Sequence, residues 1–300
     1  QNRNQLRVAR LSMVPLFFNI NELIVFGFPI VLNPIYLIPF IFVPLILTLT
    51  SWASVTLGWV PHAGYSVEWT TPIFVSGFYA TGSLRGSLLQ LVNLVIGSLC
   101  YLPFVLLSET LSRSRQKRLF GELLDEYKRA EAGNRQPAFF SKRGASGNMA
   151  TLLAEELKTA LCDQTLALFY QPQVDYHGRV FCAEGLLRWN HPIFGYIYPP
   201  LAVALAEHYG FSDELGFYTL QEACKAVERL SKADMREVDI SVNVTALQLK
   251  NESFCNGLFA ILQVHRVAPS RLKLEITEKV ALENDEKIRC ALTCLADRGV

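Results

Sequence analysis

Charged residues are almost missing from the first third of this 300-residue sequence. No Asp, Glu, Lys or Arg lies between Leu23 and Val67, and none lies between Gly86 and Ser108. Each run exceeds the roughly 20 residues that an α-helix needs to cross a hydrocarbon core about 30 Å thick. The lack of charge argues against a water-soluble domain here and predicts membrane helices within residues 1–108.

The two uncharged runs differ in their proline content. The second run, GSLLQLVNLVIGSLCYLPFVLLS, has no polar stripe at helical spacing, which predicts one spanning helix. The first run contains Pro29, Pro34, Pro39 and Pro44. Because proline removes a backbone donor and clashes with the preceding turn, we expect a broken helix there, as in transporters.

Clustered cysteines and a strong net charge are also missing. The seven cysteines contain no CxxC pair, which argues against a zinc site or a disulfide framework and favours reduced thiols. The net charge is only +1, so a nucleic-acid polymer is not an expected partner. One basic cluster directly follows the second run and predicts that the chain from Glu109 onward is cytoplasmic; it consists of Arg113, Arg115, Lys117 and Arg118.

A few polar residues flank the first uncharged run. They are Asn19, Asn21, Glu22 and Asn33 near its start, and Trp69, Thr70 and Thr71 after Glu68. They either line a path for a polar solute or simply face loops. A glutamate at membrane depth is costly without a purpose, which favours the path.

Two stretches of this part, NINELIVFGFPIVLNPIYLIPFIFVPLI and VEWTTPIFVSGFYATGSLRGSLLQLVN, resemble a known family. It is the C-terminal part of component IIC of the lactose/cellobiose/chitobiose family of the phosphoenolpyruvate-dependent sugar phosphotransferase system (PTS). The resemblance covers roughly residues 1–108. It implies that Glu22 reaches the sugar, although Leu23 stands where the family usually has proline. Asn19 and Trp69, from the polar residues of the expected path, are further sugar-binding candidates. It also implies a β-linked disaccharide of the cellobiose type as substrate and components IIA and IIB as partners.

The next segment is charged and then loses its periodicity. Residues 109–131 predict a helix whose apolar stripe of Leu111, Leu119, Leu123 and Leu124 is narrow, which favours a solvated stalk over a signalling helix. Gly, Pro, Ser and Asn then predict a linker with a domain boundary near Asn148. The expected domains are 1–108 in the membrane, 109–148 as connector and 149–300 in the cytoplasm.

Strands and helices alternate after the linker. Expected strands cover residues 166–176, 179–189, 238–246 and 271–278, and expected helices cover 151–163, 199–210, 213–230, 253–264 and 284–297. Such βα units predict an α/β domain with a mostly parallel sheet, and a β/α barrel collects its chemistry at the C-terminal ends of the strands.

Polar residues interrupt three of these strands among apolar neighbours. Glu184, Asn243 and Glu275 would share the inner wall, where a carboxylate or amide needs a partner. Oxygen ligands without histidine or thiolate favour Mg²⁺ or Mn²⁺. Arg188 lies four residues after Glu184, on the same strand face, and suits a bidentate phosphate contact.

The stretches EGLLRWNHPIFGYIYP, SVNVTALQL and LEITE resemble the EAL domain, the cyclic di-GMP phosphodiesterase family with a modified, TIM-like β/α barrel. The resemblance runs from about residue 149 to the end and covers about the first half of such a domain. It implies hydrolysis of cyclic di-GMP to the linear dinucleotide. The implied roles are metal ligation by Glu184, Asn243 and Glu275, with both glutamates catalytic, phosphate contact by Arg188, nucleotide contact by Gln171, and loop ordering by Glu278.

The sequence departs from the EAL pattern in two places. Gly185 replaces the usual alanine, and Val300 precedes the acidic pair, lysine and glutamate that the family carries later. We therefore expect a fragment of a PTS permease fused to a phosphodiesterase, inactive as these 300 residues. The whole would be a multi-pass protein of the bacterial inner membrane with a cytoplasmic EAL domain, and a second copy in a homodimer is a candidate partner. Two alternatives are a degenerate EAL domain that regulates the transporter by binding a nucleotide or a partner, and a transporter with a vestigial appendage.

Overall fold

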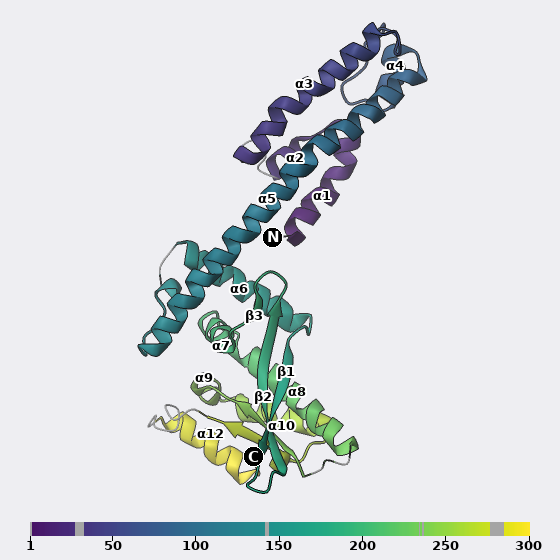
Figure 1. The fold of residues 1–300 in the computed structure, drawn as a ribbon. Coiled ribbons are helices and arrows are strands. Elements are labelled where there is room, and N and C mark those ends of the chain that lie inside the picture. The colour runs from purple at the N-terminus through teal and green to yellow at the C-terminus, as the bar shows by residue number, and fades with distance from the viewer. Residues whose placement is uncertain (1, 28–32, 142–143, 234, 236, 277–284) are drawn as a thin grey trace. The chain divides into compact units, whose positions relative to one another are not determined.

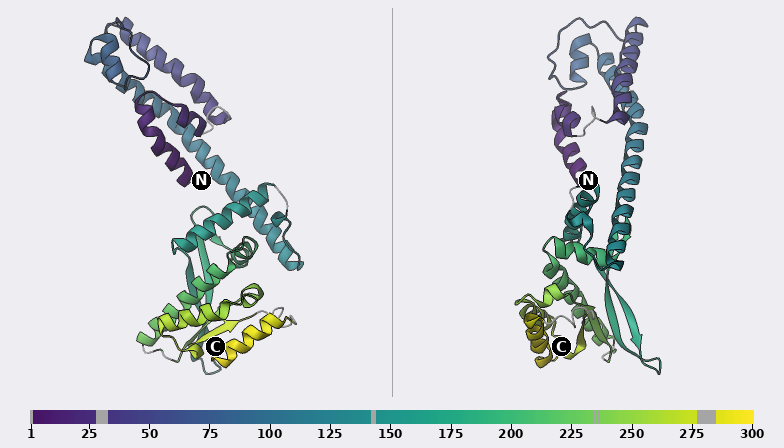
Figure 2. Two further views of the ribbon diagram at one scale, coloured as in Figure 1. Left: turned by 180° about the vertical axis from the view of Figure 1, so that it is seen from behind. Right: turned by 90° about the vertical axis from the view of Figure 1, so that its left-hand side faces the viewer.

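The computed structural model describes residues 2–27, 33–141, 144–233, 235, 237–276 and 285–300 of the chain. Contacts divide it into two units, Gln1–Arg115 and Gln116–Val300. Helix α5, Leu84–Ala132, contributes residues to both units. Each unit is described by itself below, and Figures 1 and 2 show the elements of each.

The first unit is helical (Figure 1). It consists of α1 Asn2–Phe17, α2 Glu22–Gly27, α3 Pro34–Thr56, α4 Val75–Thr81 and the beginning of α5. Both α3 and α5 are long and apolar enough to cross a membrane. Most of their apolar side chains are exposed in the unit, which suits contact with lipid better than contact with water. The predicted N-terminal apolar helices are thus confirmed.

Helix α3 begins at a proline and contains two more. Pro34 occupies the first turn, where its missing N–H costs nothing, and the Asn33 side chain accepts the Ile35 N–H at 3.0 Å. Pro39 and Pro44 lie inside the helix, which continues to Thr56. The break predicted for this run therefore does not occur at these two prolines, because each removes one hydrogen bond and the remaining ladder holds. Pro29 lies outside the described residues.

The second unit is built on an open sheet in the order β1-β2-β4-β5, with β3 paired to β2. The strands are β1 Ala167–Val174, β2 Val180–His191, β3 Gly195–Ile197, β4 Asp239–Asn243 and β5 Leu272–Glu275. β1 and β2 form an antiparallel hairpin, whereas β2, β4 and β5 are parallel. The α/β class is confirmed, and among the described residues the sheet does not close, as expected for half a barrel.

Helices cover one face of this sheet (Figure 2). The helices and short 3₁₀ turns of this unit, after α5, are α6 Ala145–Cys162, α7 Pro199–His208, α8 Ser212–Lys232, α9 Ala246–Leu249, α10 Phe254–His265, α12 Glu286–Asp297, η1 Ala138–Phe140 and η2 Pro269–Arg271. Ile240, Val242 and Leu272 are buried in one core with Leu220 and Leu258 of the helices. The apolar residues of β4 and β5 therefore face α8 and α10, and the polar residues between them face away.

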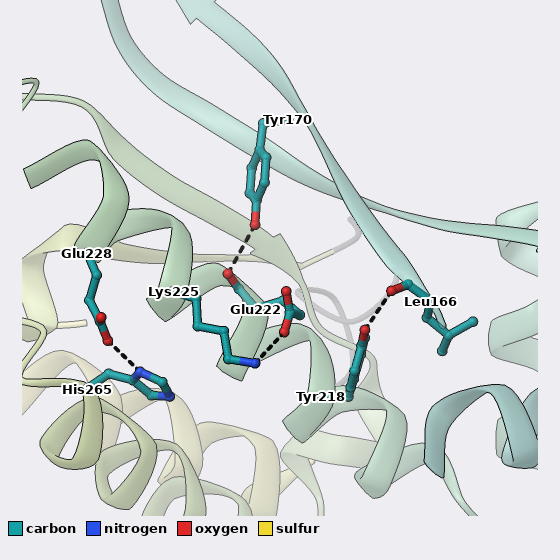
Figure 3. Close-up of polar contacts among 7 residues, drawn as sticks. All are labelled: Leu166, Tyr170, Tyr218, Glu222, Lys225, Glu228 and His265. Atoms are coloured by element: carbon teal, nitrogen blue, oxygen red, sulfur yellow. Dashed lines mark hydrogen bonds and ion pairs between the residues drawn. The ribbon is translucent and has the colours of Figure 1, made fainter. Parts of the chain in front are cut away.

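Helix α8 is tied to the sheet by tyrosine hydroxyls (Figure 3). The Tyr218 hydroxyl donates to the Leu166 carbonyl at 2.6 Å, and the Tyr170 hydroxyl donates to the Glu222 carbonyl at 3.1 Å. On its other side, the Glu228 carboxylate contacts His265 Nδ1 of α10 at 2.5 Å. These contacts fix β1, α8 and α10 relative to one another.

Alkaline pH is expected to destabilise this core. Burial raises the pKa of Tyr170 to about 12 and, with help from the Glu228 carboxylate, that of the Cys224 thiol to about 12. The unfolded thiol titrates near 8.5, so the stabilisation is complete below about pH 8.5 and is lost as the pH rises toward 12. Urea unfolding should give a lower free energy at pH 10.5 than at pH 8, with a smaller difference in Cys224→Ala. An equal pH dependence in that variant would contradict the assignment.

The end of α5 belongs to the core of the second unit. Phe120, Leu123 and Tyr127 are buried there, and the Phe120 ring stacks on Phe194 with centroids 4.7 Å apart. Phe139 of η1, in the predicted linker, is buried in the same core. The solvated stalk was therefore a wrong prediction, because the aromatic residues widen the stripe that the leucines alone leave narrow. The domain boundary near Asn148 stays a prediction.

Candidate functional site

The three polar strand residues share one face of the sheet. Asn243, at the end of β4, is the register partner of Glu275 on β5. Glu184 on β2 is the register partner of Ser241, two residues before Asn243. Register partners point to the same side of a sheet, and side chains alternate along a strand. Glu184, Asn243 and Glu275 therefore lie together on the face opposite α8 and α10.

Side-chain amides donate hydrogen bonds to the carboxylates of both Glu184 and Glu275. Asn243 Nδ2 donates to Glu184 Oε1 at 2.7 Å, and Gln173 Nε2 donates to Glu275 Oε1 at 3.3 Å. Gln171 is the register partner of Glu184 in the β1–β2 hairpin, so it lies beside the same carboxylate. The structure thus brings the predicted Gln171 to the predicted site. Gln173 was missed, although its spacing of two from Gln171 places it on the same face.

Gly185 marks a close approach of β2 to β4. A Cβ atom built there would lie 2.9 Å from Leu168 Cδ2 and 3.2 Å from the Ser241 carbonyl oxygen. The position is therefore crowded, and the absence of a side chain lets the strand that carries Glu184 lie tightly against the strand that carries Asn243.

The donor set suits a hard divalent cation. Its members are two carboxylates and an amide, which supply oxygen atoms of the kind that Mg²⁺ and Mn²⁺ prefer. Within the described residues, no cluster of three or more His, Cys, Asp or Glu side chains is close enough for a metal, so the amide is needed. Ser241, on the same face, is 1% exposed and its hydroxyl has no hydrogen-bond partner. One buried polar group beside Glu184 therefore remains unsatisfied.

Arg188 lies two residues past Leu186 on the face that carries Glu184. Its Nη1 donates to the Leu187 carbonyl at 3.0 Å. Its Cζ atom lies 5.7 Å from the centre of the Phe169 ring and 5.6 Å from that of Tyr196. Its guanidinium forms no ion pair with any carboxylate in the part of the chain that is described. Glu278, expected to order a nearby loop, lies outside the described residues.

In the first unit, two of the sugar-binding candidates meet. Asn19 has a left-handed backbone, with φ of 60°, and its Nδ2 donates to the carbonyl oxygens of Trp69 at 3.2 Å and Thr71 at 2.9 Å. The Trp69 side chain is 67% exposed. Glu22 begins α2 with an exposed side chain. Asn19 therefore holds the Trp69 loop beside the turn that leads to Glu22.

Gln90, inside the second uncharged run, has a structural role that was not predicted from the sequence. Gln90 Oε1 accepts N–H groups from Phe74 at 2.8 Å and Gly77 at 3.0 Å, and its Nε2 donates to Ser76 Oγ at 2.9 Å. It thereby satisfies backbone donors at the start of α4, where Phe74 has a φ of 71°. The two amide side chains of this uncharged run, Gln90 and Asn93, were the available signal.

Two family profiles match separate parts of the chain. Residues 2–44 match the profile of the phosphotransferase system EIIC, and residues 154–300 match that of the EAL domain. The chain joins an EIIC segment to an EAL segment. Glu184, Arg188, Asn243 and Glu275 all lie in the EAL segment, and Glu22 lies in the EIIC segment.

Curated relatives also fall into two groups, EIIC components and cyclic di-GMP phosphodiesterases. The oligo-β-mannoside-specific EIIC component of Bacillus subtilis is 37% identical over 118 residues, 39% of this chain and 27% of its own length. The bifunctional diguanylate cyclase/cyclic di-GMP phosphodiesterase MucR of Pseudomonas aeruginosa is 32% identical over 176 residues, 58% of this chain and 26% of its own length. The chain thus spans about a quarter of each relative.

A solved structure of the MucR phosphodiesterase with cyclic di-GMP is also similar to the EAL segment. It is 33% identical and has a TM-score of 0.48, with 50% of this chain and 61% of that chain covered.

Proposed function

We propose that the EAL segment binds cyclic di-GMP on the sheet face that carries Glu184, Asn243, Glu275 and Arg188. One observation supports this proposal most: these residues, far apart in sequence, share the sheet face opposite α8 and α10. Glu184, Asn243 and Glu275 would hold Mg²⁺ or Mn²⁺, and Arg188 would contact a phosphate, with Gln171 near the nucleotide and Glu278 ordering an adjacent loop.

The chemistry of a complete site would be hydrolysis of one phosphodiester bond. A bound divalent cation polarises a phosphoryl oxygen and lowers the pKa of the attacking water. The protein residues supply the rest: the Glu184 and Glu275 carboxylates hold negative charge at the site, and Arg188 fixes the phosphate orientation by charge-assisted hydrogen bonds. Asn243 would have to turn its amide from Glu184 to offer its oxygen atom.

The 300-residue chain is expected to show no phosphodiesterase activity. Two carboxylates and one amide leave a divalent cation with few protein ligands, and both carboxylates already accept hydrogen bonds from amides. Incubation with cyclic di-GMP and Mn²⁺, followed by chromatography, should therefore yield no linear dinucleotide. Formation of linear product that Glu184→Ala abolishes would contradict this expectation.

A regulatory, non-hydrolytic role is the second candidate. The same amide contacts favour this role, because they satisfy the two carboxylates without a cation. Such a face can bind a nucleotide when no cation is present. Cyclic di-GMP binding that is unchanged by EDTA would support this role, and binding that requires Mn²⁺ would support the phosphodiesterase site.

For the EIIC segment we propose a role in the permease that takes up a β-linked disaccharide with components IIA and IIB. Asn19, Glu22 and Trp69 would contact the sugar, supported by the hydrogen bonds from Asn19 to the Trp69 loop. The protein would span the bacterial inner membrane several times with its EAL domain in the cytoplasm, and a homodimer is compatible with this arrangement. Photolabelling with a cellobiose derivative should mark the Trp69 loop, and Asn19→Ala should reduce that labelling.

Removing the orphaned hydroxyl is expected to stabilise the second unit. An unsatisfied buried polar group costs about 1–3 kcal/mol, so Ser241→Ala should raise the free energy of unfolding by about 1 kcal/mol. Ser231→Ala is the matched control, because its hydroxyl donates to the Val227 carbonyl at 2.9 Å and its loss should bring no gain. Urea unfolding followed by fluorescence measures both, and a destabilised Ser241→Ala would show that the hydroxyl has a partner.

A further inference from the structure

Arg188 is flanked by one aromatic ring from β1 and one from β3. In the β1–β2 register Ala167 pairs with Arg188 and Phe169 pairs with Leu186, so Phe169 is a diagonal neighbour of Arg188. In the β2–β3 register Tyr196 pairs with Asn190, so it is a diagonal neighbour on the other side. Diagonal neighbours on one face are within reach of aromatic and long side chains.

Both rings stay largely open to solvent. Phe169 is 62% exposed and Tyr196 is 53% exposed, so neither ring serves mainly to fill a core. Their centres lie 5.7 and 5.6 Å from the Arg188 Cζ atom, within the cation–π range of about 6 Å. Both rings therefore stand beside the guanidinium at the solvent-exposed surface.

Arg188 keeps most of its donors available. A guanidinium has about five N–H donors, and the backbone carbonyl of Leu187 takes one of them. The two ring contacts stabilise the charge and leave the N–H donors unused. An aspartate or glutamate partner would instead accept hydrogen bonds from those donors. An arginine held in this way is ready for an external anion, because no carboxylate among the residues that the structure describes pairs with it and would have to be displaced first.

We infer that Phe169 and Tyr196 are positioning residues that hold the Arg188 guanidinium for the phosphate of the bound nucleotide. This inference rests on the proposed function and adds two positioning residues to the proposed binding site. The rings restrict the rotamers of Arg188, so less conformational entropy is lost when the phosphate binds.

Nucleotide binding to the protein in detergent micelles provides the first test. Each exposed cation–π contact is worth about 0.5–1 kcal/mol, so Phe169→Leu and Tyr196→Leu should each weaken cyclic di-GMP binding about two- to fivefold. Phe169→Tyr and Tyr196→Phe should restore the affinity. In an Arg188→Ala background the two leucine substitutions should cause no further loss. Tyr176→Leu, which removes a 92% exposed ring at the hairpin tip, is the matched control and should bind like wild type.

A measurement without nucleotide keeps this inference separate from the proposed function. The rings shield the Arg188 guanidinium, so Phe169→Leu and Tyr196→Leu should increase its rate of modification by phenylglyoxal, followed by mass spectrometry of the peptide. If wild type fails to bind cyclic di-GMP, the proposed function is wrong and the modification rates still decide the inference. Unchanged modification rates, or further loss of affinity in the Arg188→Ala background, would overturn the positioning role.

Discussion

Leu123→Ala is expected to lower the free energy of unfolding of the second unit by about 2–5 kcal/mol. Leu123 is fully buried, and it lies on α5 against the core that contains Trp189, Leu201 and Leu205. Truncation leaves a cavity that these neighbours fill only in part. The loss would be a large share of the about 5–15 kcal/mol that stabilises a typical domain.

The control lies on the same helix. Leu111→Ala removes a leucine that is 50% exposed, before the part of α5 that belongs to the second unit, and should change the stability of that unit little. Urea unfolding monitored by tryptophan fluorescence compares the two variants. Equal unfolding midpoints would mean that residues 116–132 are a stalk after all.

Arg188→Ala is expected to weaken cyclic di-GMP binding about tenfold to a hundredfold. Hydrogen bonds to charged groups contribute about 1.5–3 kcal/mol each, and 1.36 kcal/mol corresponds to a factor of ten. The substitution leaves Phe169 and Tyr196 in place, so the loss reports on the guanidinium itself. Isothermal titration of the nucleotide into wild type and variant measures it.

Arg179→Ala is the matched control for charge. Arg179 directly precedes β2, is mostly exposed, and pairs with Asp175 at 3.0 Å. Its removal changes the net charge by the same amount as Arg188→Ala. If the two variants lose affinity equally, the effect is long-range electrostatics, and the proposed phosphate contact at Arg188 is not supported.

Several elements of the second unit could be predicted because their patterns are strong. The strands around Glu184 and Asn243 carry alternating or continuous apolar residues, and the turn at Gly178, with φ of 77°, separates β1 from β2. The parallel pairing that brings Asn243 beside Glu275 followed from the βα alternation. The shared face of the candidate site was therefore accessible from spacing alone.

Other features depend on contacts that a linear pattern does not display. The three residues of β3 are too few for a periodic signal, and they matter because Tyr196 lies among them. The burial of Phe120 and Tyr127 needs partners from α6, β2 and α7. The orphaned hydroxyl of Ser241 and the contact from Gln173 to Glu275 exist only once β1, β2, β4 and β5 are in register.

Helix α5 has two parts that differ in composition. Its residues 86–108 are uncharged and mostly exposed, as suits lipid, whereas residues 109–132 carry charged side chains and the buried Phe120 and Tyr127.

Calorimetric titration of cyclic di-GMP into the protein in the presence of Mn²⁺ tests the central claim most directly. The account predicts saturable binding that weakens with salt, that falls with Arg188→Ala, and that loses its dependence on Mn²⁺ in Glu184→Ala. Absence of binding by the wild-type protein, or equal affinity in the Glu184→Ala/Arg188→Ala double variant, would contradict it.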